Sequence, residues 1–179
     1  DFRKPLVIMT PKSLLRNKLC VSNLEDFGNQ NSFHRVLWDH ATDPKENSFI
    51  KLKERNKIRK VILCSGKVYF DLLEAREKLK KDDVVLIRIE QLYPFPVKSL
   101  VKEIKAYKNN AKFYWCQEEP KNMGAWFSVR DYIQWTLDYI SANNNQISYI
   151  GRDTAASPAT GYAKRHLFQQ REIIEKVFK

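Results

Sequence analysis

The chain of 179 residues is long enough for one ordinary domain with an appendage, and its hydrophobic fraction of 43% and aromatic fraction of 12% exclude wholesale disorder. Its 32 lysines and arginines outnumber its 21 acidic residues, which gives a net charge of +11 and leaves binding to a polyanion open. Three cysteines without CxxC spacing exclude a disulfide scaffold and indicate a reducing compartment, and no apolar run approaches the ~20 residues that cross a bilayer.

Residues 1–50 are predicted to contain two short strands in an otherwise irregular chain. Residues 6–9 form an apolar run that is followed by Thr10 and Pro11, a pattern typical of a buried strand whose hydrogen-bond ladder stops at a proline. Residues 20–57 are polar and irregular, and within them only residues 33–38 have strand character. We therefore expect a linker with one strand in it before the regular part of the chain.

From residue 59 onward, apolar runs alternate regularly with amphipathic stretches. Buried strands are predicted at residues 61–64, 84–89, 112–117 and 147–150. Helices are predicted over residues 68–81, 96–107, 122–140 and 165–178, and Pro96 suits the start of the second one. This order predicts a three-layer, Rossmann-like α/β domain with a mostly parallel sheet, helices on both faces and right-handed crossovers.

The positive charge is concentrated in residues 51–81, which contain eleven basic and four acidic side chains. Such a run could meet nucleic acid or another polyanion. Five of the basic residues belong to the helix predicted around residues 67–81, where they are expected to occupy the outward face. The solvated surface is therefore the favoured interpretation of this run.

Two sets of residues at predicted strand ends are candidates for chemistry. Ser65, Gly66 and Lys67 form a strand-to-helix turn where backbone N–H groups could hold an anion, but the spacing of a P-loop or a GxGxxG motif is absent, so a structural turn with a surface lysine is favoured. Glu118 and Glu119 follow the third strand, where ligands of open sheets gather. Neighbouring side chains on a strand point to opposite faces, which favours separately partnered carboxylates over an acid–base pair.

Other reactive residue types show no motif. His34, His40 and His166 are scattered, and no Cys or His pair has the spacing of a metal site. Ser157 lacks the GxSxG sequence around a hydrolase nucleophile, and its small neighbours fit a packed loop or a helix cap. The sequence therefore indicates no metal site and no serine nucleophile.

Large aromatic residues are more frequent than one small core requires. Because Trp and Tyr anchor protein interfaces, a buried interface is the favoured explanation, with part of the set in the core. The rings concerned are Tyr93, Phe95, Tyr114, Trp115, Trp126, Phe127, Tyr132 and Trp135.

Five segments carry a family resemblance. They read RKPLVIMTPKSLLR at residues 3–16, CSGKVY at 64–69, RIEQLYPFP at 88–96, WCQEEPKNMGAW at 115–126, and YIGR with ASPATG at 149–152 and 156–161. In this order they closely resemble the C-terminal end of the decarboxylase component of 2-oxoglutarate dehydrogenase. The resemblance spans nearly the whole chain, apart from residues 20–57.

The resemblance implies a function for a larger enzyme. That oxidoreductase of the tricarboxylic acid cycle decarboxylates 2-oxoglutarate on thiamine diphosphate and Mg²⁺ and transfers succinyl to a lipoyl group. Its implied partners are a second copy in a homodimer, the lipoyl-bearing succinyltransferase component and dihydrolipoamide dehydrogenase. No nucleic acid and no membrane are expected as partners. The implied location is the bacterial cytoplasm or the mitochondrial matrix. The Gly-Asp-Gly motif for thiamine diphosphate is absent from this chain. We therefore expect a fragment that is inactive alone, with the catalytic, cofactor-binding and metal residues upstream.

The same resemblance assigns domains and residues. Residues 1–50 are expected to be the end of the pyrimidine-binding domain plus a linker, and residues 51–179 a transketolase C-terminal-like α/β domain with a structural and dimer-forming role. The alternative is a regulatory module for acetyl-CoA or another anion, with Lys4, Ser65 and Lys67 as its residues. Interface or structural roles are expected for Tyr93, Phe95, Trp115, Glu118, Glu119, Lys121, Asn122, Trp126 and Arg152.

Overall fold

The computed structural model describes residues 2–43 and 49–179, and the chain divides into two compact units, Asp1–Phe33 and His34–Lys179. Among residues 2–33 the regular elements are two 3-10 turns, η1 (Lys12–Leu14) and η2 (Leu24–Phe27). The strand predicted at residues 6–9 is wrong, because these residues are irregular and all four side chains are exposed. A strand needs a neighbouring strand to accept its backbone hydrogen bonds, and the described part of this unit contains none.

The second unit is built on a five-stranded sheet in the order β1-β3-β2-β4-β5. Its strands are β1 (Val36–Leu37), β2 (Lys60–Cys64), β3 (Val84–Ile89), β4 (Lys112–Pro120) and β5 (Ser148–Arg152). β1 runs antiparallel to β3, and all other pairs are parallel. All five residues of β2 are buried, which is why its sequence is continuously apolar after Lys60.

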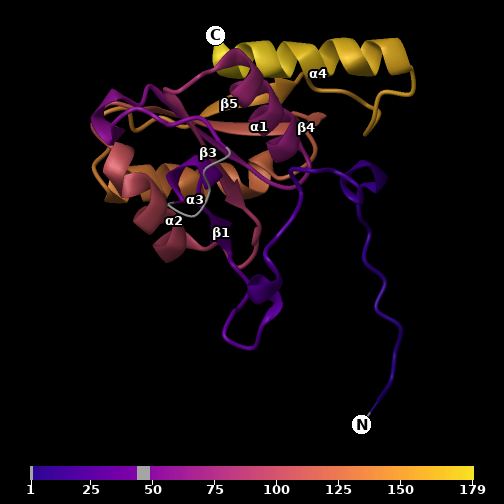
Figure 1. Cartoon of the computed structure of the whole chain (residues 1–179). Helices are drawn as coiled ribbons and strands as arrows, with labels where there is room; N and C mark the ends of the chain where they lie inside the picture. Colours follow the sequence, from indigo (N-terminus) through magenta and orange to yellow (C-terminus); the bar gives the residue numbers. More distant parts are fainter. Residues whose placement is uncertain (1, 44–48) are drawn as a thin grey trace. The chain divides into compact units, whose positions relative to one another are not determined.

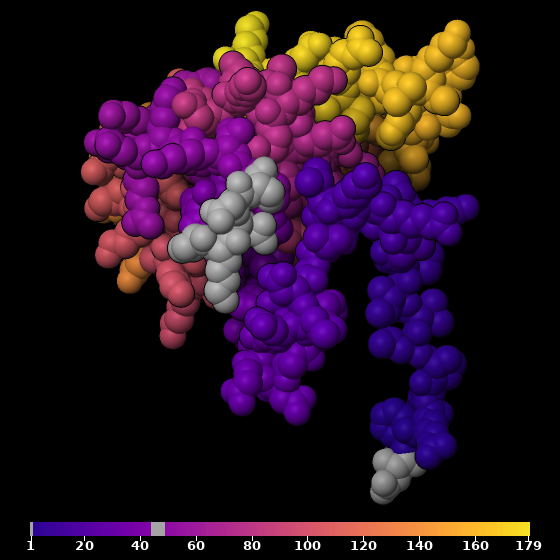
Figure 2. Space-filling view, viewed as in Figure 1, coloured from indigo at the N-terminus to yellow at the C-terminus, as the bar shows by residue number. Residues whose placement is uncertain are grey.

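Among the described residues, the helices that cover the sheet are α1 (Val68–Leu79), α2 (Val97–Ile104), α3 (Trp126–Tyr139) and α4 (Ala163–Phe178). Short 3-10 turns add η3 (His40–Thr42), η4 (Arg55–Lys57) and η5 (Lys105–Tyr107). α1 and α4 lie on one face and α2 and α3 on the other (Figure 1), and the yellow α4 forms part of the visible surface in the space-filling view (Figure 2). The predicted three-layer α/β domain with a mostly parallel sheet is confirmed.

The main hydrophobic core lies between the sheet and the α2–α3 layer. Leu63 of β2 and both Phe113 and Trp115 of β4 point into it, where Ile133 and Leu137 of α3 meet them. The alternate residues of β2 and β3, such as Ile62 and Leu86, are buried under α1 and α4 instead. Each face of the sheet is thus sealed by its own helix pair.

Two basic residues of the run at 51–81 are buried, which corrects the prediction of a wholly solvated face. Arg76 of α1 is 0% exposed and pairs with Asp39. Lys60 is 7% exposed, and its ammonium donates to the carbonyls of Lys176 at 3.3 Å and Val177 at 2.9 Å, at the carboxyl end of α4. A cation suits that position because the end of a helix carries partial negative charge.

Two boundaries differ from the prediction. β4 continues to Pro120, because its later residues pair with β5 up to Arg152. α3 begins at Trp126 and not near residue 122, because Met123 N bonds to the carbonyl of Pro120 at 2.8 Å and Gly124 adopts a left-handed φ of 65°. Residues 121–125 therefore form a tight turn between strand and helix.

Candidate functional site

The strand order places a topological switch point between β2 and β4. The chain leaves β2 toward β3 on one side, while β4 lies on the other side of β2. Ligands of open α/β sheets bind beyond the carboxyl ends of the strands at such a point. The residues there are Ser65, Gly66 and Lys67 after β2, and Glu118 and Glu119 near the end of β4. The candidate site is therefore this carboxyl edge.

Lys67 is held by two carboxylates from different elements. Its ammonium lies 2.8 Å from Glu118 of β4 and 3.0 Å from Asp71 of α1. Burial alone would lower the pKa of Lys67, but the hydrogen bonds to Glu118 and Asp71 outweigh it and the pKa is raised. Gln170 of α4 donates to the same two carboxylates, to Asp71 at 2.8 Å and to Glu118 at 3.3 Å. This cluster links three elements, and its two acids oppose the approach of another anion.

The neighbouring carboxylates do not form a catalytic pair. Glu118 turns inward to Lys67, whereas Glu119 is exposed. Cys64, at the end of β2, and Cys116, in the middle of β4, stand side by side in register, and both are buried. Burial raises the pKa of Cys64 to about 12 and raises that of Cys116 as well, so neither thiol is a ready nucleophile.

A buried amide that sequence reasoning missed organises the turn after β4. The side-chain oxygen of Gln117 accepts from Trp115 Nε1 at 2.9 Å and from the backbone N–H of Trp126 at 3.0 Å, and its amide nitrogen donates to the carbonyl of Met123 at 2.7 Å. Gln117 is 3% exposed. A glutamine inside the apolar run Tyr-Trp-Cys-Gln was the available signal, because a buried amide needs partners.

The predicted aromatic residues divide into core and surface. Trp115 and Trp126 are 1% and 8% exposed and pack inside the core of the second unit. Tyr93 is exposed, and Phe95 stacks on Tyr132 with ring centroids 5.3 Å apart. α3 carries four exposed rings, which we call the α3 aromatic face: Phe127, Tyr132, Trp135 and Tyr139.

Three other candidate residues of the second unit lie around the same edge. Asn122 exchanges two hydrogen bonds with the backbone of Ala155, and the Lys121 ammonium lies 5.6 Å from the centre of the Tyr149 ring. Arg152 at the end of β5 contacts His166 and Gln170 of α4 at 3.0 and 3.2 Å. Lys4 belongs to the first unit, where it is exposed and its ammonium lies over the ring of Phe2.

Gly151 in β5 offers a test of the packing at this edge. A methyl group there would lie 2.8 Å from the backbone oxygen of Gln117 and collide with the Tyr149 hydroxyl, which donates to the carbonyl of Arg152 at 3.0 Å. We expect Gly151→Ala to lower the free energy of unfolding by about 1–3 kcal/mol, the usual cost of overpacking. A methyl group on Gly161 meets nothing within 4 Å, so Gly161→Ala is the matched control and should change stability by less than about 0.5 kcal/mol in urea denaturation. Equal losses would contradict the described fit.

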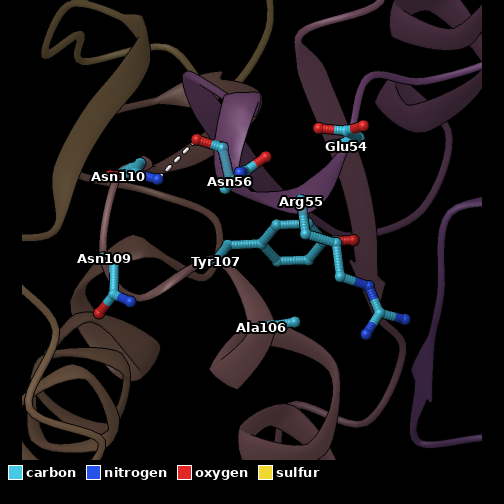
Figure 3. Close-up of a pocket in the computed structure, with 7 residues that line it drawn as sticks. All are labelled: Glu54, Arg55, Asn56, Ala106, Tyr107, Asn109 and Asn110. Carbon is cyan, nitrogen blue, oxygen red and sulfur yellow. Dashed lines mark hydrogen bonds between the residues drawn. The ribbon is translucent and has the colours of Figure 1, made fainter.

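The described residues of the second unit line a larger and a smaller pocket. The larger, of about 490 Å³, is near η4 and η5 at the opposite, amino edge of the sheet, where Arg55 extends beside the Tyr107 ring and Asn110 bonds to the carbonyl of Asn56 (Figure 3). The smaller, of about 270 Å³, opens at the carboxyl edge beside Arg152 and the start of α4. Only the smaller one adjoins the residues singled out from the sequence.

Residues 2–43 and 49–179 contain neither a metal-binding cluster nor a membrane-spanning helix. No three His, Cys, Asp or Glu side chains in that part of the chain gather in a way that could hold a metal ion. None of its helices combines the length and the apolarity needed to cross a membrane.

Comparison with known proteins gives a consistent match. Residues 21–178 match the family model described as 2-oxoglutarate dehydrogenase C-terminal. The 2-oxoglutarate dehydrogenase E1 component of Brucella anthropi is 54% identical over 175 residues, and that of Brucella ovis is 53% identical over the same length. Each alignment covers 98% of this chain but 17% of the relative, so the chain spans about a sixth of these proteins. The chain therefore belongs to the 2-oxoglutarate dehydrogenase C-terminal family.

Proposed function

We propose that this chain is the C-terminal domain of the E1 component of a 2-oxoglutarate dehydrogenase, and that it helps to hold that enzyme as a homodimer. The names of the relatives and the extent of the match support the first part. The complete enzyme would decarboxylate 2-oxoglutarate on thiamine diphosphate and Mg²⁺ and pass succinyl to the lipoyl group of its succinyltransferase partner, with dihydrolipoamide dehydrogenase completing the complex. Residues 1–50 would belong to the end of the preceding domain and a linker.

The residues present do not fit the cofactor. The sequence has no Gly-Asp-Gly, and residues 2–43 and 49–179 contain no cluster of His, Cys, Asp or Glu suited to a metal ion. The carboxyl edge instead holds paired charges and buried thiols. We therefore assign no chemical step to this chain and place the catalytic residues in the part of the enzyme that it does not cover.

The α3 aromatic face is the observation that carries the assembly role. Trp135 and Tyr139 are 55% and 67% exposed and stack on each other with ring centroids 5.5 Å apart. Tyr132 continues the same face and is joined by Phe95 from the loop before α2. Soluble proteins rarely leave such contiguous apolar surface in water, and Trp and Tyr are the usual anchors of interfaces. The face therefore favours burial against a second subunit.

Sedimentation velocity of the full-length enzyme over a dilution series tests this role. The double variant Trp135→Ala, Tyr139→Ala should weaken dimerisation by at least about tenfold, because interface anchors of this type cost ~1–2 kcal/mol or more when truncated. Phe168→Ala, on α4 and 61% exposed, removes a ring of similar exposure away from α3 and should leave the dimer unchanged. If the double variant dimerises as tightly as the native enzyme, the assembly role of this face is wrong.

The alternative is a regulatory module that binds acetyl-CoA or another anion through Lys4, Ser65 and Lys67. Gly66, with a φ of 69°, and the start of α1 do form a strand-to-helix turn at the carboxyl edge. However, Glu118 and Asp71 already neutralise the Lys67 ammonium. The charge balance around Lys67 therefore favours the assembly role over this alternative.

A further inference from the structure

We infer that the larger pocket, at the amino edge of the sheet, binds a small carboxylic acid that carries a second polar group. The pocket has a volume of about 490 Å³, which is within the usual range for a small-molecule site. Its lining comes from residues 54–56, which precede β2, and from residues 106–110, which precede β4. The inference is independent of the proposed dimerisation, because no residue of α3 lines this pocket.

Tyr107 supplies a hydrogen-bonding group without a partner at this pocket. The residue is 7% exposed and lines the pocket. Among residues 2–43 and 49–179, its hydroxyl has no hydrogen-bond partner, although a polar group in so buried a residue normally has one. The Tyr69 hydroxyl is sealed from the surface, whereas that of Tyr107 is not, so a ligand can reach it. Burial raises the pKa of Tyr107, so the hydroxyl stays protonated at neutral pH and can donate.

Arg55 adds a positive charge beside the Tyr107 ring (Figure 3). No carboxylate pairs with this guanidinium within 4.0 Å in the part of the chain that the structure describes. Its charge offsets part of the rise in the pKa of Tyr107, as expected of a cation close to the hydroxyl. Glu54, the acid among the described lining residues, is paired with Lys57 at 3.0 Å. The pocket therefore combines a free cation with a free hydroxyl donor.

The wall of the pocket before β4 is held in place by amides from a distant loop. Asn143 and Asn144 donate to the backbone carbonyls of Asn109 at 3.0 Å and Asn110 at 3.3 Å. Asn110 in turn donates to the carbonyl of Asn56 across the pocket (Figure 3). These bonds fix the backbone on both sides before any ligand arrives, and a preformed site loses less entropy on binding.

These groups define the class of ligand. A guanidinium forms charge-assisted hydrogen bonds to a carboxylate, and a tyrosine hydroxyl can donate one more. The side-chain amides of Asn56 and Asn109 also line the pocket, and amides both donate and accept, which suits a second polar group on the ligand. A phosphate dianion is a poorer match, because proteins hold it with several cationic or helix-start donors and the described lining has one guanidinium.

Isothermal titration calorimetry of the full-length enzyme at constant ionic strength tests the inference. The probes are acetate, malate and inorganic phosphate. We expect malate to bind more tightly than acetate, because it adds a second polar group, and more tightly than phosphate. Arg55→Gln should weaken malate binding by about fivefold or more, through loss of a charge-assisted hydrogen bond. Tyr107→Phe removes the hydroxyl alone and should weaken malate binding by about threefold or more.

Lys105→Gln is the matched control. It removes an exposed positive charge next to Ala106 but does not line the pocket, so it should change the affinity by less than about twofold. Circular dichroism checks that each variant is folded, and malate bound in the active site of the complete enzyme would give the same heat in all of them. No malate binding, equal affinity in all variants, equal weakening by Lys105→Gln, or tighter binding of phosphate would overturn the inference. None of these results would bear on dimerisation through α3.

Discussion

Replacing Asp39 with alanine is expected to lower the free energy of unfolding by about 3–5 kcal/mol, because it leaves the charge of Arg76 buried without its partner. Asp39 and Arg76 are 1% and 0% exposed. The Asp39 carboxylate also accepts from the backbone N–H groups of Leu86 at 2.7 Å and Ala41 at 2.9 Å. One substitution therefore removes the acceptor for a buried cation and for two backbone donors.

Urea denaturation of Asp39→Ala measures this loss, and Glu54→Ala provides the matched control. Glu54 pairs with Lys57 at 3.0 Å, but both side chains are more than half exposed. Exposed ion pairs contribute little, so Glu54→Ala should change stability by at most about 0.5–1 kcal/mol. A similar small change for Asp39→Ala would show that the segment around η3 does not seal Arg76 from water.

The regular part of the fold could be predicted because local pattern and tertiary packing agree there. In α2, for example, the apolar stripe that includes Leu100 and Ile104 is the face that the core buries. In β2, an apolar run after one basic residue predicted a buried strand, and the structure buries this strand on both faces. The parallel sheet then followed from the alternation of the elements.

The Arg76–Asp39 pair could not be predicted from local pattern. Arg76 lies in a basic stretch that reads as a helix surface, and its partner is 37 positions away, after a two-residue strand. The pair forms because β1 joins the edge of β3 and brings Asp39 under α1. Such a contact depends on tertiary docking, and the periodicity of the helix carries no information on it.

The position of the candidate site could be predicted from the sequence, but the contacts between its residues could not. Strand ends placed Lys67 and Glu118 at the carboxyl edge, yet their pairing requires β2 and β4 to be neighbours, which the chain order does not determine. The hydrogen bonds of Gln117 and of Arg152 could not be predicted, since their partners come from a later turn and from α4. Likewise, the identity of a Trp residue does not say whether it faces the core or water.

Trp115→Ala is expected to lower the free energy of unfolding by roughly 3–5 kcal/mol, the usual cost of truncating a buried Trp or Phe. The ring is 1% exposed on β4 and packs in the core between the sheet and the α2–α3 layer. Its loss opens a cavity and also removes the hydrogen bond that Trp115 Nε1 donates to the side-chain oxygen of Gln117 at 2.9 Å. The turn that leads into α3 should loosen as a consequence.

Trp135→Ala makes the matched comparison, because it removes the same side chain from the α3 aromatic face. Trp135 is 55% exposed. At subunit concentrations below the dissociation constant of the dimer, its truncation should therefore change the free energy of unfolding by less than about 0.5 kcal/mol. Urea denaturation of both variants, followed by circular dichroism at high dilution, separates the two roles. If the core ring stabilises the fold and the surface ring serves the proposed dimer contact, only Trp115→Ala should shift the transition. A comparable shift for Trp135→Ala would mean that the α3 aromatic face is packed inside the domain and is not available for assembly.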